Sequence, residues 1–344
     1  MIFWKVTPSN EKEIALLNIY RVDHIGQIVA ELEPQVALLE GLFGFQPGRT
    51  WENAADGCRG ILLDVPGSWG HRWEVLAPLG KDSPVQALLD SRGPGLHHVA
   101  VEVPNMDAAV QQMEQVGMRA ERRRADPAGR WIDVPFVPPT RETGLLFRVF
   151  GPPLRGTCGD DSVPRMAAAE SGKGQTSPSL GIVAIEQIGH AYWDRDELAR
   201  WCESALGMHE VYRTPKGKHT DIATLVLTIP GTQMRWEIIQ PVGDNAFVQR
   251  FLDKRGAESH HVTFEVHDWH RALTACEHHK IPTFGENEGV TDGARWRDTF
   301  IHPRHTGGIL VQFFWEERPG VWSRSDKVPW TAQQETRVPS TQDG

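Results

Sequence analysis

The chain has 344 residues, of which 40% are hydrophobic, so it is long and apolar enough to form two ordinary domains with cores. Its formal net charge of −9 argues against a nucleic-acid partner, because phosphate recognition needs a concentrated basic face. No apolar run approaches the roughly 20 residues of a membrane span, and no signal-peptide pattern opens the chain, so we expect a cytoplasmic protein that does not enter membranes.

From the N-terminus onward, four segments show the same predicted order of a strand followed by a helix. These strand and helix pairs lie at residues 22–29 and 34–42, 96–103 and 106–116, 185–192 and 196–206, and 260–266 and 269–278. Gly44, Gly117 and Gly207 follow three of the helices, where glycine is the expected stop signal. Short alternating apolar runs come next, which predicts three antiparallel strands per segment. Each segment is therefore predicted as a βαβββ module, and the fold class as α+β.

The modules are grouped in two copies of one longer unit. Trp-Glu, then Val-Gln-x-x-Leu-Asp-x-Arg-Gly, then His-His-Val begin at Trp73, Val85 and His97, and again 163 residues later at Trp236, Val248 and His260. Such a repeat indicates duplication. We expect a first domain at 20–151, a linker at 152–180, a second domain at 181–317 and a C-terminal arm at 318–344, because residues 152–180 are rich in Gly, Pro, Ser and Ala without periodicity.

The sequence motifs of the first copy resemble those of a known family. Asp23-His24 is followed by Ile-Gly, residues 73–79 read Trp-Glu-Val-Leu-Ala-Pro-Leu, and residues 95–100 read Gly-Leu-His-His-Val-Ala. These motifs resemble the glyoxalase, or vicinal oxygen chelate, superfamily in a tandem duplicated form, with methylmalonyl-CoA epimerases the most similar in wording. The resemblance implies two cup-shaped, mostly antiparallel sheets, in which each module supplies metal ligands from its first and last strands.

The ligand positions implied by the resemblance can be located by their spacing in the first copy. Glu74 follows His24 by 50 residues and His98 follows it by 74. The fourth position, a Glu in the family, falls on Arg148. This departure matters because arginine stays protonated and cannot ligate a metal.

The same spacing recurs in the second copy. Glu237 and His261 follow Gln187 by 50 and 74 residues, and the fourth position falls on Gln312. Imidazole and carboxylate groups together suit Fe, Mn, Co, Ni or Zn, so we expect a divalent transition metal as the cofactor.

Two pairings of the modules are open at this stage. If the outer modules pair, one cup collects His24, Glu74, His261 and Gln312. We favour this pairing because it gives a complete set of two imidazoles, one carboxylate and one amide, and leaves the other cup impaired.

In the alternative pairing, neighbouring modules share a cup. His24 and Glu74 then join His98 and Arg148, while Glu237 belongs to the other cup. His24 and Glu74 belong to the better site in either case.

The chemistry implied by the resemblance is proton transfer at a carbon beside a carbonyl, assisted by the metal. Glu74, His98 and Asp298 are the candidates for the catalytic acid and base. Arg148 and Trp296 are predicted to contact the substrate, and Trp296 and Asp298 belong to an Arg-Trp-x-Asp segment that occurs once in each copy.

Among the substrates that the family accepts, a small α-hydroxyketone resembling a sugar or a cyclitol, of the 2-epi-5-epi-valiolone type, suits two-oxygen chelation best. Alternatives are an acyl-CoA epimerase, a glyoxalase-type lyase, and a protein of another class that binds a small molecule without turnover. The expected partner is thus a small-molecule substrate, and a homodimer is left open.

Overall fold

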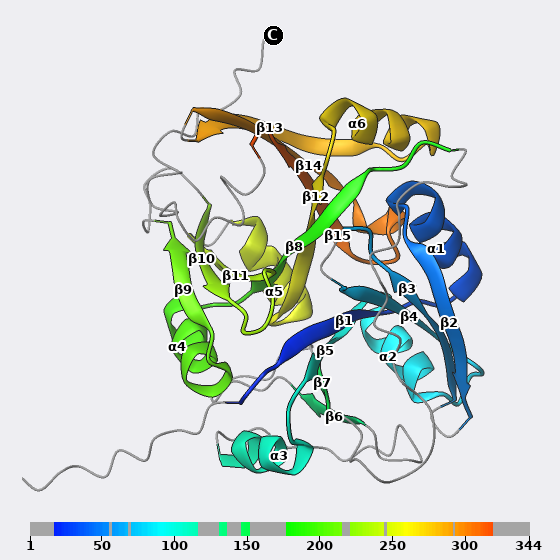
Figure 1. Cartoon of the computed structure of the whole chain (residues 1–344), viewed down its shortest axis with the longest axis vertical. Coiled ribbons are helices and arrows are strands. Elements are labelled where there is room, and N and C mark those ends of the chain that lie inside the picture. Colours follow the sequence, from blue (N-terminus) through cyan, green and yellow to red (C-terminus); the bar gives the residue numbers. More distant parts are fainter. Residues whose placement is uncertain are drawn as a thin grey trace, which may run out of the picture.

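The computed structural model describes residues 17–54, 57–67, 70–115, 131–135, 146–151, 177–214, 221–243, 246–291 and 293–318. Within these residues the strands form two curled, mostly antiparallel sheets of seven and eight strands, which lie side by side (Figure 1). The fold class is the one expected from the sequence. No helix among the described residues is long and apolar enough to cross a membrane.

The first sheet is formed by strands of the first half of the chain, in the order β2-β3-β4-β1-β5-β7-β6. Its strands are β1 (Arg21–Ile28), β2 (Gln46–Asn53), β3 (Cys58–Asp64), β4 (Arg72–Pro78), β5 (Gly95–Glu102), β6 (Trp131–Pro135) and β7 (Leu146–Phe150). The central strand β1 pairs in parallel with β4 and antiparallel with β5. The pairing of β1 with β5 joins the two modules of this copy.

The second sheet repeats this arrangement, in the order β13-β14-β15-β12-β8-β11-β10-β9. Its strands are β8 (Ile182–Ala191), β9 (His209–Arg213), β10 (Ile222–Thr228), β11 (Arg235–Pro241), β12 (Glu258–Val266), β13 (Thr283–Thr291), β14 (Ala294–Ile301) and β15 (Leu310–Glu316). Here β8 pairs in parallel with β11 and antiparallel with β12.

The pairing of outer modules that the ligand set favoured is wrong. Each copy instead closes on itself, because β1 hydrogen-bonds to β5 of the next module and β8 to β12. The physical reason is that β5 of the adjacent module, antiparallel to β1, satisfies backbone groups from Arg21 to Ile28, apart from register shifts at Asp23 and between Gly26 and Gln27. His261 and Gln312 therefore belong to a different sheet from His24 and Glu74.

Of the seven helical segments in the described residues, those at 32–43, 106–115, 195–206 and 269–278 begin and end close to the predicted positions. The seven segments are α1 (Leu32–Leu38), which continues as a π-helical turn η1 (Leu39–Phe43), α2 (Pro84–Arg92), α3 (Met106–Gln115), α4 (Arg195–Leu206), α5 (Phe247–Arg255), α6 (Trp269–His278) and the short 3-10 helix η2 (Pro303–His305). Gly44 and Gly207 end η1 and α4 in the left-handed conformation, with φ of 74° and 67°. The third predicted stop, Gly117, lies outside the described residues, as do most of the predicted linker and arm.

Aromatic side chains from both copies form the contact between the two sheets. Phe43 and Phe45, after α1, lie with their ring centroids 5.7 and 6.0 Å from the ring of Phe264 in β12. Trp73 in β4 lies 5.9 Å from the same ring. Because neighbouring residues of a strand point to opposite faces, Glu74 is directed away from this core, as expected.

A buried glutamine adds polar contacts between the copies. Gln27 in β1 is fully buried and its Nε2 donates to the backbone oxygens of Thr306 and Gly307, at 2.9 and 3.0 Å, in the turn that precedes β15. Its Oε1 accepts from Trp73 Nε1 at 3.0 Å and from Gln35 Nε2 at 3.1 Å. All of these groups are satisfied, so the two copies are joined by specific hydrogen bonds as well as by apolar packing.

Candidate metal centre

Four side chains from the two modules of the first copy meet on one face of the first sheet. They are His24 of β1, Glu74 of β4, His98 of β5 and Arg148 of β7, and each is at most 9% exposed. The strand register explains the meeting, since Gly26 lies opposite both Glu74 and His98. We call this face the inner face. It lies opposite the face on which Trp73 packs against Phe264 of the second sheet.

Gly26 makes room for one of these side chains. A Cβ atom at Gly26 would lie 2.0 Å from Cε1 of His98, so the imidazole of His98 rests directly against the glycine backbone. Gly189 in the second sheet has the same relation to His261, also at 2.0 Å. This Gly–His contact is therefore a feature of both copies.

The nitrogen and oxygen atoms of three side chains converge. Nε2 of His24 lies 3.1 Å from Nε2 of His98 and 3.7 Å from Oε2 of Glu74, and the distance from His98 Nε2 to the same oxygen is 3.3 Å. Within the described residues, this is the one group of three or more His, Cys, Asp or Glu side chains whose ligand atoms all lie within 4.8 Å of one another. The sequence alternative that joined His24 and Glu74 with His98 describes this arrangement.

Arg148 reaches the same carboxylate from the last strand of the copy. Its Nη1 donates to Oε2 of Glu74 at 3.0 Å, and the side chains of Arg148 and Glu74 are 11% and 8% exposed. A charge-assisted hydrogen bond with so little solvent access is strong. Arg148, at the fourth ligand position, thus hydrogen-bonds to Glu74 and does not itself offer an atom that could bind a metal.

The pKa values follow from these contacts. Burial by itself would raise the pKa of Glu74, but the charge of Arg148 and the neighbouring imidazoles of His24 and His98 hold it well below its usual range. Burial, together with the charge of Arg148, lowers the pKa of His98 to about 3. At neutral pH the site therefore presents an ionised carboxylate and a neutral imidazole, which are the forms that bind metals.

His24 has an opposite shift. Burial would lower its pKa, but the hydrogen bond to Asp23 and the negative charges of Glu74 and Asp23 raise it above the ordinary value. The imidazole of His24 lies between two carboxylates, with Nδ1 facing Asp23 at 2.8 Å and Nε2 facing Glu74.

Two residues near the site had no role assigned from the sequence. Asp23 is 2% exposed and its carboxylate contacts Arg21, Arg72 and His24. His97 places its Nδ1 3.0 Å from Nδ1 of His98. Asp23 and His97 directly precede the two predicted histidines, but strand alternation would send their side chains to the other face, so the sequence pattern alone does not place them at the site.

The second sheet holds the equivalent set on its own inner face. Oε2 of Glu237 lies 3.0 Å from His261 Nε2 and accepts from Gln187 Nε2 at 3.1 Å. Gln312 is occupied as well, since its Oε1 accepts from the hydroxyl of Thr263 at 2.8 Å. With one imidazole and one carboxylate, this set is a poorer metal site than that of the first sheet.

Asp298 and Trp296, which were predicted to act near the metal, lie in β14 of the second sheet. Asp298 is 2% exposed and its Oδ1 accepts from Asn287 Nδ2 at 2.8 Å. Trp296 is also 2% exposed, and its indole fills the space above Gly289, where a Cβ would lie 2.5 Å from Cζ2 of Trp296. Neither residue belongs to the sheet that carries His24 and Glu74.

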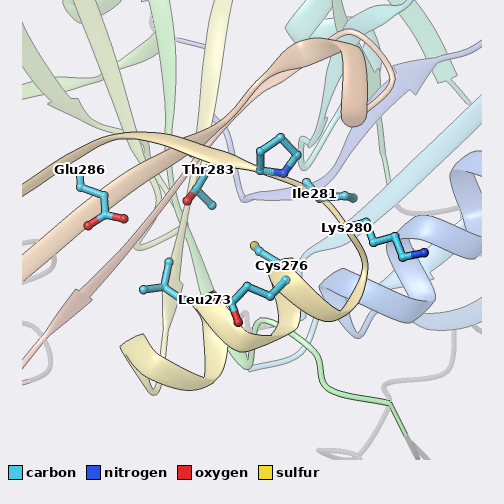
Figure 2. Close-up of a pocket in the computed structure, with 8 residues that line it drawn as sticks. Leu273, Cys276, Lys280, Ile281, Thr283 and Glu286 are labelled. Carbon is cyan, nitrogen blue, oxygen red and sulfur yellow. The ribbon is translucent and has the colours of Figure 1, made fainter.

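A cavity of about 400 Å³ lies elsewhere, between α6 and β13 (Figure 2). Leu273, Cys276, Lys280, Ile281, Thr283 and Glu286 line it, together with Glu277 and Pro282. Burial raises the pKa of the Cys276 thiol to about 12, with a further contribution from Glu277, so the thiol stays protonated at neutral pH. Cys276 is therefore not an activated nucleophile.

Comparison with known proteins agrees with this fold. The family model of the glyoxalase/bleomycin resistance protein/dioxygenase superfamily matches residues 23–133 and 186–300, one block in each copy. The chain belongs to this superfamily, and the resemblance inferred from the motifs is confirmed.

Individual relatives cover parts of the chain. Mitochondrial methylmalonyl-CoA epimerase of Homo sapiens is 25% identical over 140 residues, which is 40% of this chain and 78% of the relative. An ethylmalonyl-CoA/methylmalonyl-CoA epimerase of Cereibacter sphaeroides is 28% identical over 102 residues, 29% of this chain and 74% of the relative.

Among solved structures, a mutant of 4-hydroxymandelate synthase from Streptomyces coelicolor is similar over 91% of this chain and 97% of its own, with a TM-score of 0.61 and 14% identity. At that identity the similarity shows the shared fold alone.

Members of this superfamily use divalent metals, and the first site fits such an ion on chemical grounds. For bonds of about 2.1 Å, neighbouring ligand atoms of a tetrahedral or octahedral metal lie about 3.0 to 3.4 Å apart. The three measured separations of 3.1, 3.3 and 3.7 Å are close to that spacing. Two imidazoles and one carboxylate are also a donor set that suits Fe, Mn, Co, Ni and Zn.

Proposed function

We propose that the protein is a metal-dependent epimerase or isomerase that transfers a proton at a carbon next to a carbonyl. The observation that carries the proposal is the convergence of His24, Glu74 and His98 on the inner face of the first sheet. The similarity to acyl-CoA epimerases over 102 to 140 residues supports the same reaction type.

The proposed roles follow from the contacts of each side chain. His24 and His98 would bind the metal through Nε2, and Glu74 through its carboxylate. A divalent metal bound there would polarise the substrate carbonyl and make the neighbouring C–H more acidic. The guanidinium of Arg148, within 3.0 Å of Glu74 Oε2, would bind an oxygen of the substrate on which negative charge develops.

The proton acceptor of this reaction is proposed to be Glu74, through a carboxylate oxygen that is not bound to the metal. Of the other two catalytic candidates from the sequence, His98 would have its Nε2 lone pair on the metal, and Asp298 belongs to the second sheet. Arg148 carries no basic lone pair, and an acceptor must lie within hydrogen-bond reach of the proton that it removes.

For the substrate, we propose a small α-hydroxyketone, sugar-like or cyclitol-like, of the 2-epi-5-epi-valiolone type. Two vicinal oxygens of such a compound could complete the coordination that three protein ligands leave open. An acyl-CoA thioester is the second substrate class, and it is supported by the similarity to epimerases that act on methylmalonyl-CoA. A glyoxalase-type lyase uses the same open coordination positions.

Metal content tests the first part of the proposal. Purified full-length protein should carry, or take up, about one equivalent of Co²⁺, Ni²⁺, Mn²⁺, Fe²⁺ or Zn²⁺. Glu74→Ala should abolish this binding, whereas Glu237→Ala, the equivalent change in the second sheet, should leave it intact. Metal uptake that survives Glu74→Ala would refute the proposed centre.

Isotope exchange tests the reaction. In deuterium oxide, the metal-loaded protein should introduce label at the α-carbon of its substrate within a panel of hydroxyketones and acyl-CoA thioesters, detected by NMR or mass spectrometry. Wild-type protein that is fully metal-loaded and labels none of them would argue against proton transfer.

A specific observation also favours a second candidate, a protein that binds a small molecule without turnover. Arg148 supplies Glu74 with a permanent positive charge, which can take over the role of a cation in keeping that carboxylate ionised. This candidate predicts well-folded wild-type protein that takes up no metal, so the metal titration distinguishes the two.

A further inference from the structure

We propose that Asp23 is a positioning residue that fixes the ring orientation and tautomer of His24, so that Nε2 of His24 is available as a metal ligand. The inference rests on the proposed metal centre and assigns a function to a buried carboxylate outside its ligand set.

A bulge in β1 brings the two side chains together. In a regular strand, consecutive residues point to opposite faces, so Asp23 and His24 would not meet. The register between β1 and β5 shifts between Val22 and His24, and Asp23 is the additional residue. Bulges of this kind redirect side chains. As a result, Oδ2 of Asp23 lies 2.8 Å from Nδ1 of His24.

The carboxylate of Asp23 is itself held in place. Arg72 donates to Oδ2, and Nη1 of Arg21 lies 2.6 Å from Oδ1. Arg21 is oriented in turn by Glu102, with its Nε 2.6 Å from Oε2. Asp23 is 2% exposed, so solvent does not compete for these contacts.

The direction of the hydrogen bond follows from the acceptor. A carboxylate between two guanidinium groups is ionised and can only accept, so Nδ1 of His24 must carry the hydrogen and donate. The free lone pair of the neutral ring is then on Nε2, which faces His98 and Glu74 at 3.1 and 3.7 Å. A carboxylate that fixes the tautomer of a ligating histidine typically raises metal affinity 10- to 100-fold.

The second copy keeps the bulge but changes the residues. The register between β8 and β12 also shifts at Glu186, which is equivalent to Asp23, and the next residue is Gln187 in place of His24. An amide side chain has no tautomer to select. Glu186 and Gln187 therefore provide matched control positions within the same chain.

The test is a metal titration of full-length Asp23→Asn with Zn²⁺ and Co²⁺, by isothermal calorimetry. The amide is uncharged and has an NH2 group in place of one oxygen, so it faces the guanidinium of Arg21 or Arg72 with a donor and offers His24 Nδ1 only a weaker, neutral acceptor. We expect the dissociation constant to rise 10- to 100-fold. Asp23→Glu should recover most of the affinity, and Glu186→Gln should leave the affinity of the first site unchanged.

A double-mutant cycle separates positioning from a general structural effect. In a His24→Gln background there is no imidazole to orient, so adding Asp23→Asn should change metal affinity less than twofold. If the substitution only loosened β1, its effect would be the same in both backgrounds. Long-range ¹H–¹⁵N NMR of the Zn²⁺-loaded wild type should show Nδ1 of His24 protonated and Nε2 bound.

The experiment distinguishes failure of the proposed role of Asp23 from failure of the proposed metal centre. Wild-type protein that binds no metal refutes the metal centre itself. If the wild type binds metal and Asp23→Asn binds it with equal affinity, the proposed role of Asp23 is refuted and the metal centre is not. The same conclusion follows if Asp23→Asn loses as much affinity in the His24→Gln background as in the wild-type background. A loss of affinity confined to the His24 background supports the positioning role.

Discussion

Gly26 and Gly189 show how much a single residue contributes to the arrangement of each inner face. A Cβ at either position would lie 2.0 Å from Cε1 of a histidine, His98 in one copy and His261 in the other. Both glycines are fixed by strand pairing on two sides, so the backbone has little freedom to move away. The imidazole must then move.

We therefore expect Gly26→Ala to displace His98 and weaken metal binding at least tenfold. Overpacking of this kind should also lower the free energy of unfolding by about 1 to 3 kcal/mol. Gly189→Ala is the matched control, because it should cost similar stability without loss of metal affinity. Calorimetric titration and urea unfolding of both variants measure the two effects, and equal metal affinity in Gly26→Ala and wild type would contradict the arrangement.

Arg148 is the residue at which this site departs most from the family pattern. Its guanidinium lies 3.0 Å from Glu74 Oε2, so it opposes a metal cation at the same carboxylate. Removing a unit charge a few ångströms from an ion is worth roughly 1 to 4 kcal/mol. Arg148→Gln, which introduces the residue found at the equivalent position in the second copy, should therefore tighten metal binding about tenfold.

A suitable control for Arg148→Gln is Arg59→Gln, which removes an exposed partner of Glu33 and changes net charge equally. It should leave metal affinity unchanged. If Arg148→Gln weakened metal binding instead, Arg148 would be supporting the metal site, and its proposed opposition to the ion would be wrong.

At the scale of elements, β1 connects the site to the rest of the molecule. One face of the strand carries His24 toward Glu74 and His98, and the other directs Gln27 into the contact with the second copy. The carbonyls of Thr306 and Gly307 both accept a hydrogen bond from Gln27 Nε2.

Gln27→Leu keeps the volume but removes both the donor and the acceptor. Each buried polar group left unsatisfied costs about 1 to 3 kcal/mol, so we expect a loss of roughly 3 kcal/mol or more in urea unfolding. Gln86→Leu, which breaks an exposed hydrogen bond to Asp90 on α2, should cost at most about 0.5 kcal/mol. Similar costs for the two variants would show that Gln27 does not stabilise the contact between copies.

The order of elements could be predicted because it depends on local patterns. Apolar periodicity located α4 and α6, and glycine marked the ends of η1 and α4. Module pairing could not be predicted, because it is decided by which strand satisfies the edge of β1. The outer pairing was predicted because it collects a complete set of metal ligands in one cup. Which side chains could bind a metal does not determine which strands pair through their backbones.

The site was predictable to the same degree. Duplicated spacing identified His24 and Glu74 correctly as neighbours, since both positions lie within one module. The third partner, His98, depended on the pairing. Asp23 required knowledge of a bulge, which leaves no clear signal in a strand of alternating residues.

At the scale of the whole molecule, buried neutral histidines connect stability to pH. Burial lowers the pKa of His190 to about 3, and burial with the charge of His261 lowers that of His260 to about 3. The unfolded chain has ordinary histidines with a pKa near 6.5 and binds more protons below that pH than the folded chain does. The free energy of unfolding therefore falls as pH drops from about 6.5 toward 3.

Each such histidine adds up to about 1.4 kcal/mol per pH unit to this slope. His190→Gln introduces the residue found at the equivalent position in the first copy, Gln27. It should reduce the slope of the unfolding free energy against pH by the contribution of one histidine. Urea unfolding at pH 4.0 to 7.0 measures it. An unchanged slope in His190→Gln would mean that His190 is not held neutral in the folded protein.

The most direct measurement of the central claim is anomalous X-ray diffraction from crystals of the full-length protein grown with Co²⁺ or Zn²⁺. The account predicts one strong peak between Nε2 of His24, Nε2 of His98 and the carboxylate of Glu74, with bonds of about 2.0 to 2.2 Å. An empty first site, or a peak confined to Glu237 and His261 in the second sheet, would contradict it.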